Sequence, residues 1–183
     1  MVGLVTILPI ALVNRLLLEE KNLRLNQIFA TKVSRGKLYW THIILAISMG
    51  LIGILIFATA LGVTALSTMK NSSITMFDFI NIVINLFPSL LFFTALAALM
   101  LGFIPKLGKL VYVYLIYSFF LNYFKGILNL PQWIEKTSPQ SWLSNMPVMD
   151  FDVIAFFAMT TMSVAMMVIG YYGYKKRDMV EEA

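Results

Sequence analysis

Long runs of apolar residues, separated by short polar segments, dominate the chain. An α-helix needs about 20 mostly apolar residues to cross a bilayer. Four runs meet or nearly meet this length: Ile43–Leu66, Phe77–Ile104, Val111–Leu128 and Val153–Tyr174. None shows the alternating pattern of a membrane β-barrel strand. The pattern predicts an all-α, polytopic membrane protein with four full transmembrane helices, over residues 38–66, 77–104, 111–128 and 152–174.

The N-terminal segment is apolar but short. Met1–Val13 is interrupted by Asn14 and Arg15, and it has neither the basic start nor the small-residue cleavage site of a signal peptide. We predict that residues 1–15 are the cytoplasmic end of an incomplete spanning helix whose beginning is absent from this chain. A short buried or interfacial helix is the alternative.

Residues 16–37 carry a different periodicity, that of an amphipathic helix. Apolar residues recur at helical spacing and form one stripe: Leu25, Ile28, Phe29 and Val33. Polar residues line the opposite face: Glu20, Arg24, Gln27 and Thr31. Such a helix lies on the membrane surface, docks on a partner, or simply connects two spans. The periodicity alone does not separate these readings.

Composition supports the membrane assignment. Hydrophobic residues make up 60% of the 183 positions and charged residues 13%, whereas soluble domains have about 45–50% and about 25%. The composition therefore excludes a soluble globular domain. The net charge of +5 would suggest nucleic acid in a soluble protein, but in a membrane protein it reports topology, and we expect no nucleic-acid partner.

The basic residues predict the orientation. Three segments hold 11 of the 14 lysines and arginines: residues 16–37 with Arg15, the loop at 105–110, and the tail at 175–183. The positive-inside rule places these segments in the cytoplasm. Residues 129–151 then form the extracellular connection. Aromatic belts are expected at both boundaries, from Tyr39, Trp40, Tyr172 and Tyr174 on the inner side and Trp133 and Trp142 on the outer side.

Candidate chemistry is sparse. The chain has one histidine, His42, and no cysteine, so it offers no His/Cys metal motif. Residues 102–109 lack the spacing and the Ser or Thr of a phosphate loop. We predict no catalytic residue, no metal site and no cofactor bound by this chain. Three boundary carboxylates could serve an ion-coupled transporter or a small membrane enzyme, or could simply cap helices: Asp78, Asp150 and Asp152.

Small and polar residues inside the spans predict helix packing or a pathway. Gly50 and Gly62 each follow an alanine by four residues, a spacing that lets helices approach closely. Asn81, Asn85 and Pro88 share one helical face, which we expect to point into the bundle or a pathway. Four methionines of the last span could line a route for apolar cargo or pack in the core: Met159, Met162, Met166 and Met167.

One stretch carries a family resemblance. Glu19-Glu20-Lys21-Asn22-Leu23-Arg24, followed by Ala30-Thr31-Lys32-Val33-Ser34-Arg35 and a long span, resembles the cytoplasmic coupling segment of bacterial ATP-binding-cassette export permeases of the type-2 group. Lys32 stands where that group commonly has proline. The order of the later spans and the long connection at 129–151 are also similar to that group.

The resemblance implies one six-span transmembrane domain, of which this chain is the C-terminal part. It implies a multi-pass permease in the bacterial cell membrane that exports a drug, antibiotic, lipid or peptide. The partners would be a cytoplasmic ATPase, which binds ATP and Mg, and a second transmembrane domain, identical or different. Contacts with the ATPase would come from the coupling residues: Glu19, Glu20, Arg24, Thr31, Ser34 and Arg35. A non-catalytic membrane scaffold remains a further alternative.

Overall fold

A computed structural model describes residues 2–21, 34–68, 75–128, 131–143 and 151–177. Within these ranges the regular elements are helical, with no strand. The long helices are α1 (Val2–Lys21), α3 (Arg35–Thr68), α4 (Met76–Phe103), α5 (Leu110–Leu128) and α7 (Val153–Lys176). The short ones are η1 (Pro105–Leu107), α6 (Gln132–Glu135) and η2 (Pro139–Trp142). The predicted all-α fold is confirmed.

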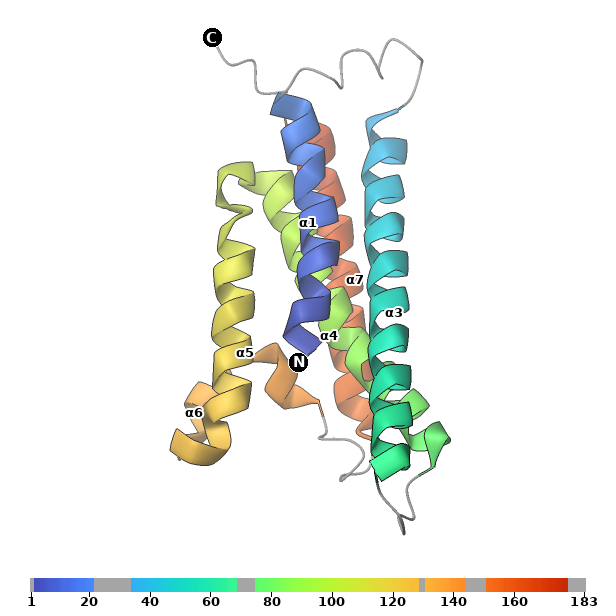
Figure 1. Cartoon of the computed structure of the whole chain (residues 1–183). Coiled ribbons are helices and arrows are strands. Elements are labelled where there is room, and N and C mark those ends of the chain that lie inside the picture. Colours follow the sequence, from blue (N-terminus) through green and yellow to red (C-terminus); the bar gives the residue numbers. More distant parts are fainter. Residues whose placement is uncertain (1, 22–33, 69–74, 129–130, 144–150, 178–183) are drawn as a thin grey trace.

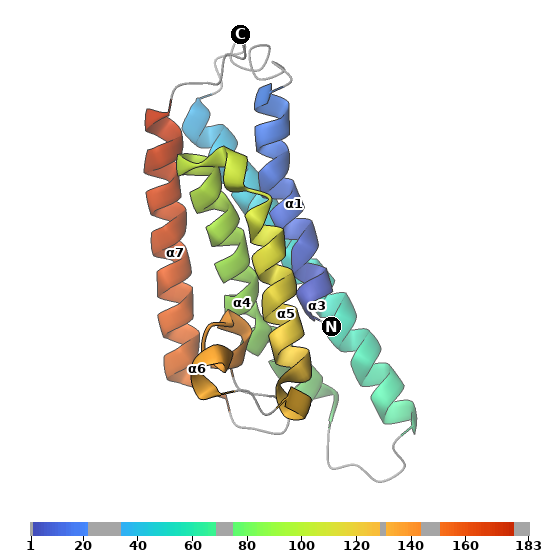
Figure 2. The same cartoon turned by 90° about the vertical axis from the view of Figure 1, so that its left-hand side faces the viewer.

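The long helices form one elongated bundle (Figures 1 and 2). α1, α4 and α7 end at the same end of the bundle at which α3 and α5 begin, at the top of Figure 1. We call this the basic end, because it carries the exposed lysines Lys37, Lys106, Lys109, Lys175 and Lys176. α6 and η2 lie toward the opposite end.

Four of the described helical segments are long and apolar enough to span a membrane. They are Arg35–Thr68, Phe79–Phe103, Pro105–Phe124 and Val153–Lys176. These four segments match the four predicted spans, with boundaries shifted by a few residues. The prediction of four apolar helices of spanning length is therefore confirmed.

α1 differs from the expected N-terminal segment. The helix does not end at Asn14 or Arg15 but continues to Lys21, so residues 16–21 extend α1. Asn14 is accommodated because its Nδ2 donates a hydrogen bond to the carbonyl of Gly108, 3.2 Å away, in the turn between α4 and α5. Asn14, which resembles a helix boundary in the sequence, thus binds α1 to the turn between α4 and α5.

α4 is the central helix. Its most apolar stretch is 67% buried, against 22–28% for the other three candidate spans. α4 packs against α1, α3, α5 and α7, and its contact with α7 is the most extensive in the described chain. Buried alanines and phenylalanines of α4 fill the middle of the core: Phe92, Phe93, Ala95, Ala97 and Ala98.

Glycines bring α4 and α7 into backbone contact. A Cβ added at Gly102 would lie 2.2 Å from the carbonyl oxygen of Gly170, and one added at Gly170 would lie 2.7 Å from the carbonyl oxygen of Ala98. Both distances are far below a van der Waals contact with backbone atoms, which cannot rotate away. Only glycine fits at these two positions, so they fix how closely the two helices pack.

The predicted small-residue spacing on α3 falls on its buried stripe. Ala46, Gly50, Ala58 and Gly62 are all buried. A Cβ added at Gly50 would lie 2.3 Å from Leu90 of α4 and 2.7 Å from Pro9 of α1. Gly50 therefore marks the point where three helices cross.

The connection between α5 and α7 folds back onto α5. The hydroxyls of Ser118 and Ser138 lie 2.5 Å apart and are buried, and Tyr114 donates to the carbonyl of Thr137 at 2.8 Å. Leu143, just after η2, is also buried. The described part of this connection is therefore packed against the bundle.

Candidate functional site

The basic end contains a buried ion pair that joins the C-terminal ends of α1 and α7. Arg177 follows the last turn of α7, and its guanidinium contacts the carboxylate of Glu20 near the end of α1. Only 15% of the Arg177 side chain and 3% of the Glu20 side chain are exposed. Each of these buried charges stabilises the fold only while the other is present, because a buried charge without a partner is strongly destabilising.

Arg177 also binds α4, and the sequence explains why an acceptor is free there. In a continuing helix, the carbonyl of Leu101 would accept a hydrogen bond from the amide of residue 105. That residue is Pro105, which has no N–H. Nη1 of Arg177 donates to the Leu101 carbonyl instead, at 2.8 Å. The Arg177 side chain thus balances the charge of Glu20 near the end of α1 and supplies a hydrogen-bond donor to the Leu101 carbonyl near the end of α4.

The start of α3 joins the same cluster. Ser34 caps this helix, because its hydroxyl accepts a hydrogen bond from the amide of Lys37 at 3.3 Å. The next residue, Arg35, donates from Nη1 to the carbonyl of Arg177 at 3.0 Å. We call Glu20, Arg35, Leu101 and Arg177 the Arg177 junction. It fastens α7 to the helices on both sides of residues 22–33.

Aromatic rings support the junction from within the bundle. The guanidinium carbon of Arg177 lies 5.7 Å from the centroid of the Tyr174 ring, within cation–π range. The ring of Tyr174 stacks on that of Tyr39 at 5.5 Å, and the Tyr39 hydroxyl donates to the carbonyl of Met167 at 2.7 Å. Tyr39 and Tyr174 therefore do not form a lipid-facing aromatic belt. Both are buried, because they pack α3 against α7.

The predicted coupling residues divide into three groups. Glu20, Ser34 and Arg35 are brought together with Arg177 or at the adjoining cap, whereas Glu19 forms an exposed pair with Arg15 at 3.4 Å. Arg24 and Thr31 lie outside the described residues.

Glu20, which the sequence places on the polar face of an amphipathic helix, is buried within the bundle. Its side chain is buried because the guanidinium of Arg177 replaces water as its partner.

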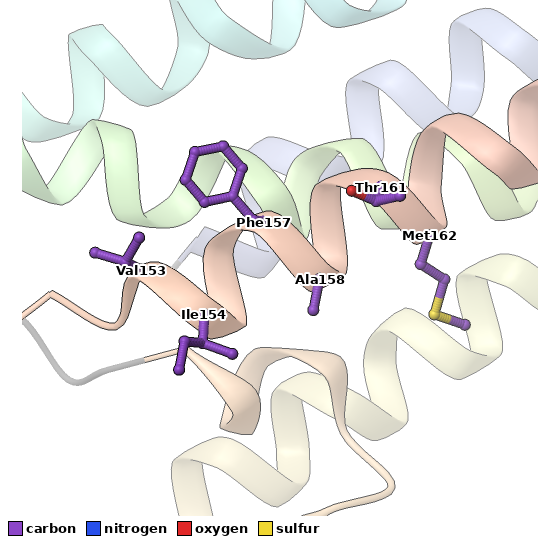
Figure 3. Close-up of a pocket in the computed structure, with 6 residues that line it drawn as sticks. All are labelled: Val153, Ile154, Phe157, Ala158, Thr161 and Met162. Carbon is purple, nitrogen blue, oxygen red and sulfur yellow. The ribbon is translucent and has the colours of Figure 1, made fainter.

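A groove of about 720 Å³ runs along α7 at the end opposite the junction. In Figure 3, Ile154, Ala158 and Met162 project to one side of the helix, while Val153 and Phe157 project to the other. Its lining is almost entirely apolar, and Ile154 and Phe157 are 83% and 61% exposed.

The four methionines of α7 do not share this groove. Only Met162 lines it. Met159 and Met167 belong to the core, where they are 1% and 4% exposed. The packing interpretation therefore holds for these two methionines.

The remaining polar candidates have structural partners where they are described. Asp152 caps α7, because its carboxylate accepts a hydrogen bond from the amide of Ala155 at 3.0 Å. Nδ1 of His42 lies 3.0 Å from the carbonyl of Leu38 one turn earlier in α3. Asp150 lies outside the described residues, as does the side chain of Asp78. Among the described residues, no group of three or more potential metal ligands comes together.

The polar face of α4 turns into the bundle. Asn85 is 3% exposed and Pro88 is also buried, while Asn81 is half-buried. α4 continues as one helix through Pro88. These residues are therefore part of the packed interior of the described bundle.

Comparison with protein families identifies the chain. Residues 1–175 match the model of the C-terminal domain of the multidrug efflux system permease Rv1217c. The chain belongs to this family. A search among curated proteins found no match.

Membership of this efflux permease family makes the chain a membrane permease domain of an efflux system. The family indicates a transporter rather than an enzyme, and its apolar helices indicate a multi-pass membrane protein. The family match names a multidrug efflux permease and does not specify the type-2 ATP-binding-cassette group that the sequence resembles.

The sequence does not single out the residue at the centre of the junction. Arg177 stands in it only as one basic residue of the tail at 175–183, which predicts topology. One local signal was present: Pro105 leaves the carbonyl of Leu101 without its helical donor. Gly170 was missed as well, although Ala98 and Gly102 show the four-residue spacing of a close helix contact.

Proposed function

We propose that this efflux permease domain is the transmembrane part of an ATP-binding-cassette exporter of the type-2 group, in the bacterial plasma membrane with its C-terminus in the cytoplasm. A separate cytoplasmic ATPase binds ATP and Mg and supplies the energy. A second transmembrane domain, identical or different, completes the pathway. The observation that carries this proposal is the Arg177 junction, which ties both borders of residues 22–33 to α7.

The junction gives residues 22–33 a mechanical connection to the bundle. An ATPase that closes on ATP would push on this segment at the cytoplasmic surface. A push displaces the end of α1 and the start of α3, and the bonds of Glu20 and Arg35 to Arg177 carry the displacement to α7. Because Gly102 and Gly170 hold α4 and α7 in backbone contact, these two helices would move as a unit. Such rigid-body motion can open a cavity between two domains.

The proposed cargo is apolar or amphipathic: a drug, antibiotic, lipid or peptide. The groove on α7 supports this class, because its lining combines an exposed aromatic ring, a flexible methionine and aliphatic side chains. Met162 and Phe157 can adapt to ligands of different shape without directed hydrogen bonds. Of the carboxylates that an ion-coupled mechanism would use, Asp152 is engaged in capping α7.

A crosslinking experiment tests the proposed ATPase contact. The chain has no cysteine, so Arg24→Cys introduces a unique thiol in the proposed coupling segment. Ser67→Cys, near the end of α3 that lies farthest from the basic end, is the matched control. We expect Arg24→Cys, and not Ser67→Cys, to crosslink to an ATP-binding-cassette subunit in membranes, with a yield that changes on adding ATP. No crosslink in any nucleotide state overturns the proposal.

A further inference from the structure

A pocket of about 340 Å³ opens on the bundle surface at the basic end, beside the Arg177 junction. The ends of α4 and α7 form it, from Gly102, Phe103, Tyr172, Gly173, Lys176 and Arg177. The two glycines contribute no side chain, and the Phe103 ring lies close to the Cα of Gly173. Phe103 and Tyr172 form exposed aromatic walls, with 54% and 58% of their surfaces accessible.

The position of the pocket relative to the membrane follows from the elements that form it. Phe103 ends the apolar helix α4, and Lys176 ends the apolar helix α7. The pocket therefore lies where the hydrocarbon region gives way to the headgroups. Its walls are apolar on the bilayer side, and the Lys176 ammonium stands at its polar rim.

The electrostatics favour an anion at this rim. Lys106 and Lys175 are also exposed at this end, although they do not line the pocket. The described carboxylates nearest this end are paired: Glu19 with Arg15, and Glu20 with Arg177, which itself lines the pocket. An anion at the rim would therefore meet Lys176 without competition from Glu20.

We infer that this pocket binds an anionic phospholipid of the inner leaflet. The phosphate meets the Lys176 ammonium, and an acyl chain lies against Phe103 and Tyr172. Basic pockets between transmembrane helices on the cytoplasmic side suit such headgroups. The inference rests on the cytoplasmic orientation of the basic end in the proposed function. A lipid wedged here would touch α4 and α7 directly beside the junction, so its binding would stabilise their contact.

Native mass spectrometry of the delipidated full chain in detergent tests the inference. The probes are dioleoylphosphatidylglycerol, dioleoylphosphatidylcholine and inorganic phosphate. We expect the phosphatidylglycerol to bind more tightly than the phosphatidylcholine. Lys176→Gln should weaken phosphatidylglycerol binding about fivefold, the contribution of one interfacial lysine. Lys176→Arg should retain it. Lys175→Gln removes the same charge from the neighbouring position, which does not line the pocket, and should leave binding almost unchanged.

Three results would overturn the inference. Equal binding of the two lipids would show that no anionic headgroup is recognised. Equal losses in Lys176→Gln and Lys175→Gln would show a diffuse basic surface rather than a pocket. Displacement of the lipid by millimolar inorganic phosphate would show a site for the free anion. The assay contains no ATPase, so failure of the proposed export function would leave its result standing.

Discussion

The Arg177 junction predicts a large difference between removing one charge and removing both. Arg177→Met leaves the Glu20 carboxylate buried at 3% exposure without its ionic partner. Glu20→Met leaves the guanidinium without a carboxylate, although it keeps its hydrogen bond to the Leu101 carbonyl. The double variant leaves no unpaired charge. Arg15→Met, which breaks the exposed pair with Glu19, is the matched control, because it also removes one arginine of an ion pair.

Burial sets the magnitudes. Breaking a buried ion pair by removing one partner costs about 3–5 kcal/mol, whereas replacing both partners by apolar side chains is often close to neutral. The double variant still loses the bond from Arg177 to the Leu101 carbonyl, which contributes about 1 kcal/mol. The exposed pair of Arg15, whose side chain is 67% accessible, contributes less than about 1 kcal/mol. The expected order of damage is therefore each single variant, then the double variant, then the control.

Thermal unfolding of the purified chain in detergent, followed by tryptophan fluorescence, measures this order. For a chain of this size about 1 kcal/mol corresponds to about 2–4 °C. Each single variant should lower Tm by about 6–20 °C, the double variant by about 2–4 °C, and Arg15→Met by no more than about 4 °C. Single variants as stable as Arg15→Met would refute the buried pair. A double variant whose Tm loss equals the sum of the two single losses would refute the coupling between Glu20 and Arg177.

Further predictions concern packing and the candidate polar groups. Gly170→Ala should lower Tm by several degrees because its methyl group meets the backbone carbonyl of Ala98. Gly53→Ala, whose methyl group meets a side-chain methyl of Val5 and no backbone atom, should cost less in the same unfolding assay. Asp152→Ala should lower the free energy of unfolding by about 1 kcal/mol through loss of the helix cap. Dye efflux from cells should continue in this variant. Abolished efflux at an unchanged protein level would favour an ion-coupled mechanism. His42→Gln should likewise leave efflux intact, and a lost pH dependence of efflux in that variant would count against the exporter.

Much of the fold could be predicted from apolar run lengths alone. A span of about 20 apolar residues is a local property, so the four spanning helices needed no tertiary information. The end of α1 was harder to predict. Asn14 and Arg15 look like a helix boundary in the sequence, but the hydrogen bond from Asn14 to Gly108 depends on a turn 94 residues away.

The candidate site was predicted only in part, for the same reason. Glu20 and Arg35 could be singled out because the sequence around them resembles the coupling segment of type-2 export permeases. Their partner Arg177 lies 157 residues from Glu20, and periodicity does not report which helices end side by side. Tyr39 and Tyr174 show the same limit, because an aromatic residue at a span boundary suits both a membrane interface and a contact between helices. Which of the two it makes is decided by the neighbouring helix.

The energy source of transport tests the central claim most directly. Inverted membrane vesicles that contain the full-length permease and its partner subunits would be loaded with a fluorescent apolar dye from outside. The account predicts dye accumulation that requires ATP and Mg, stops with orthovanadate, and survives a protonophore. Accumulation driven by a proton gradient without ATP, and abolished by the protonophore, would contradict it.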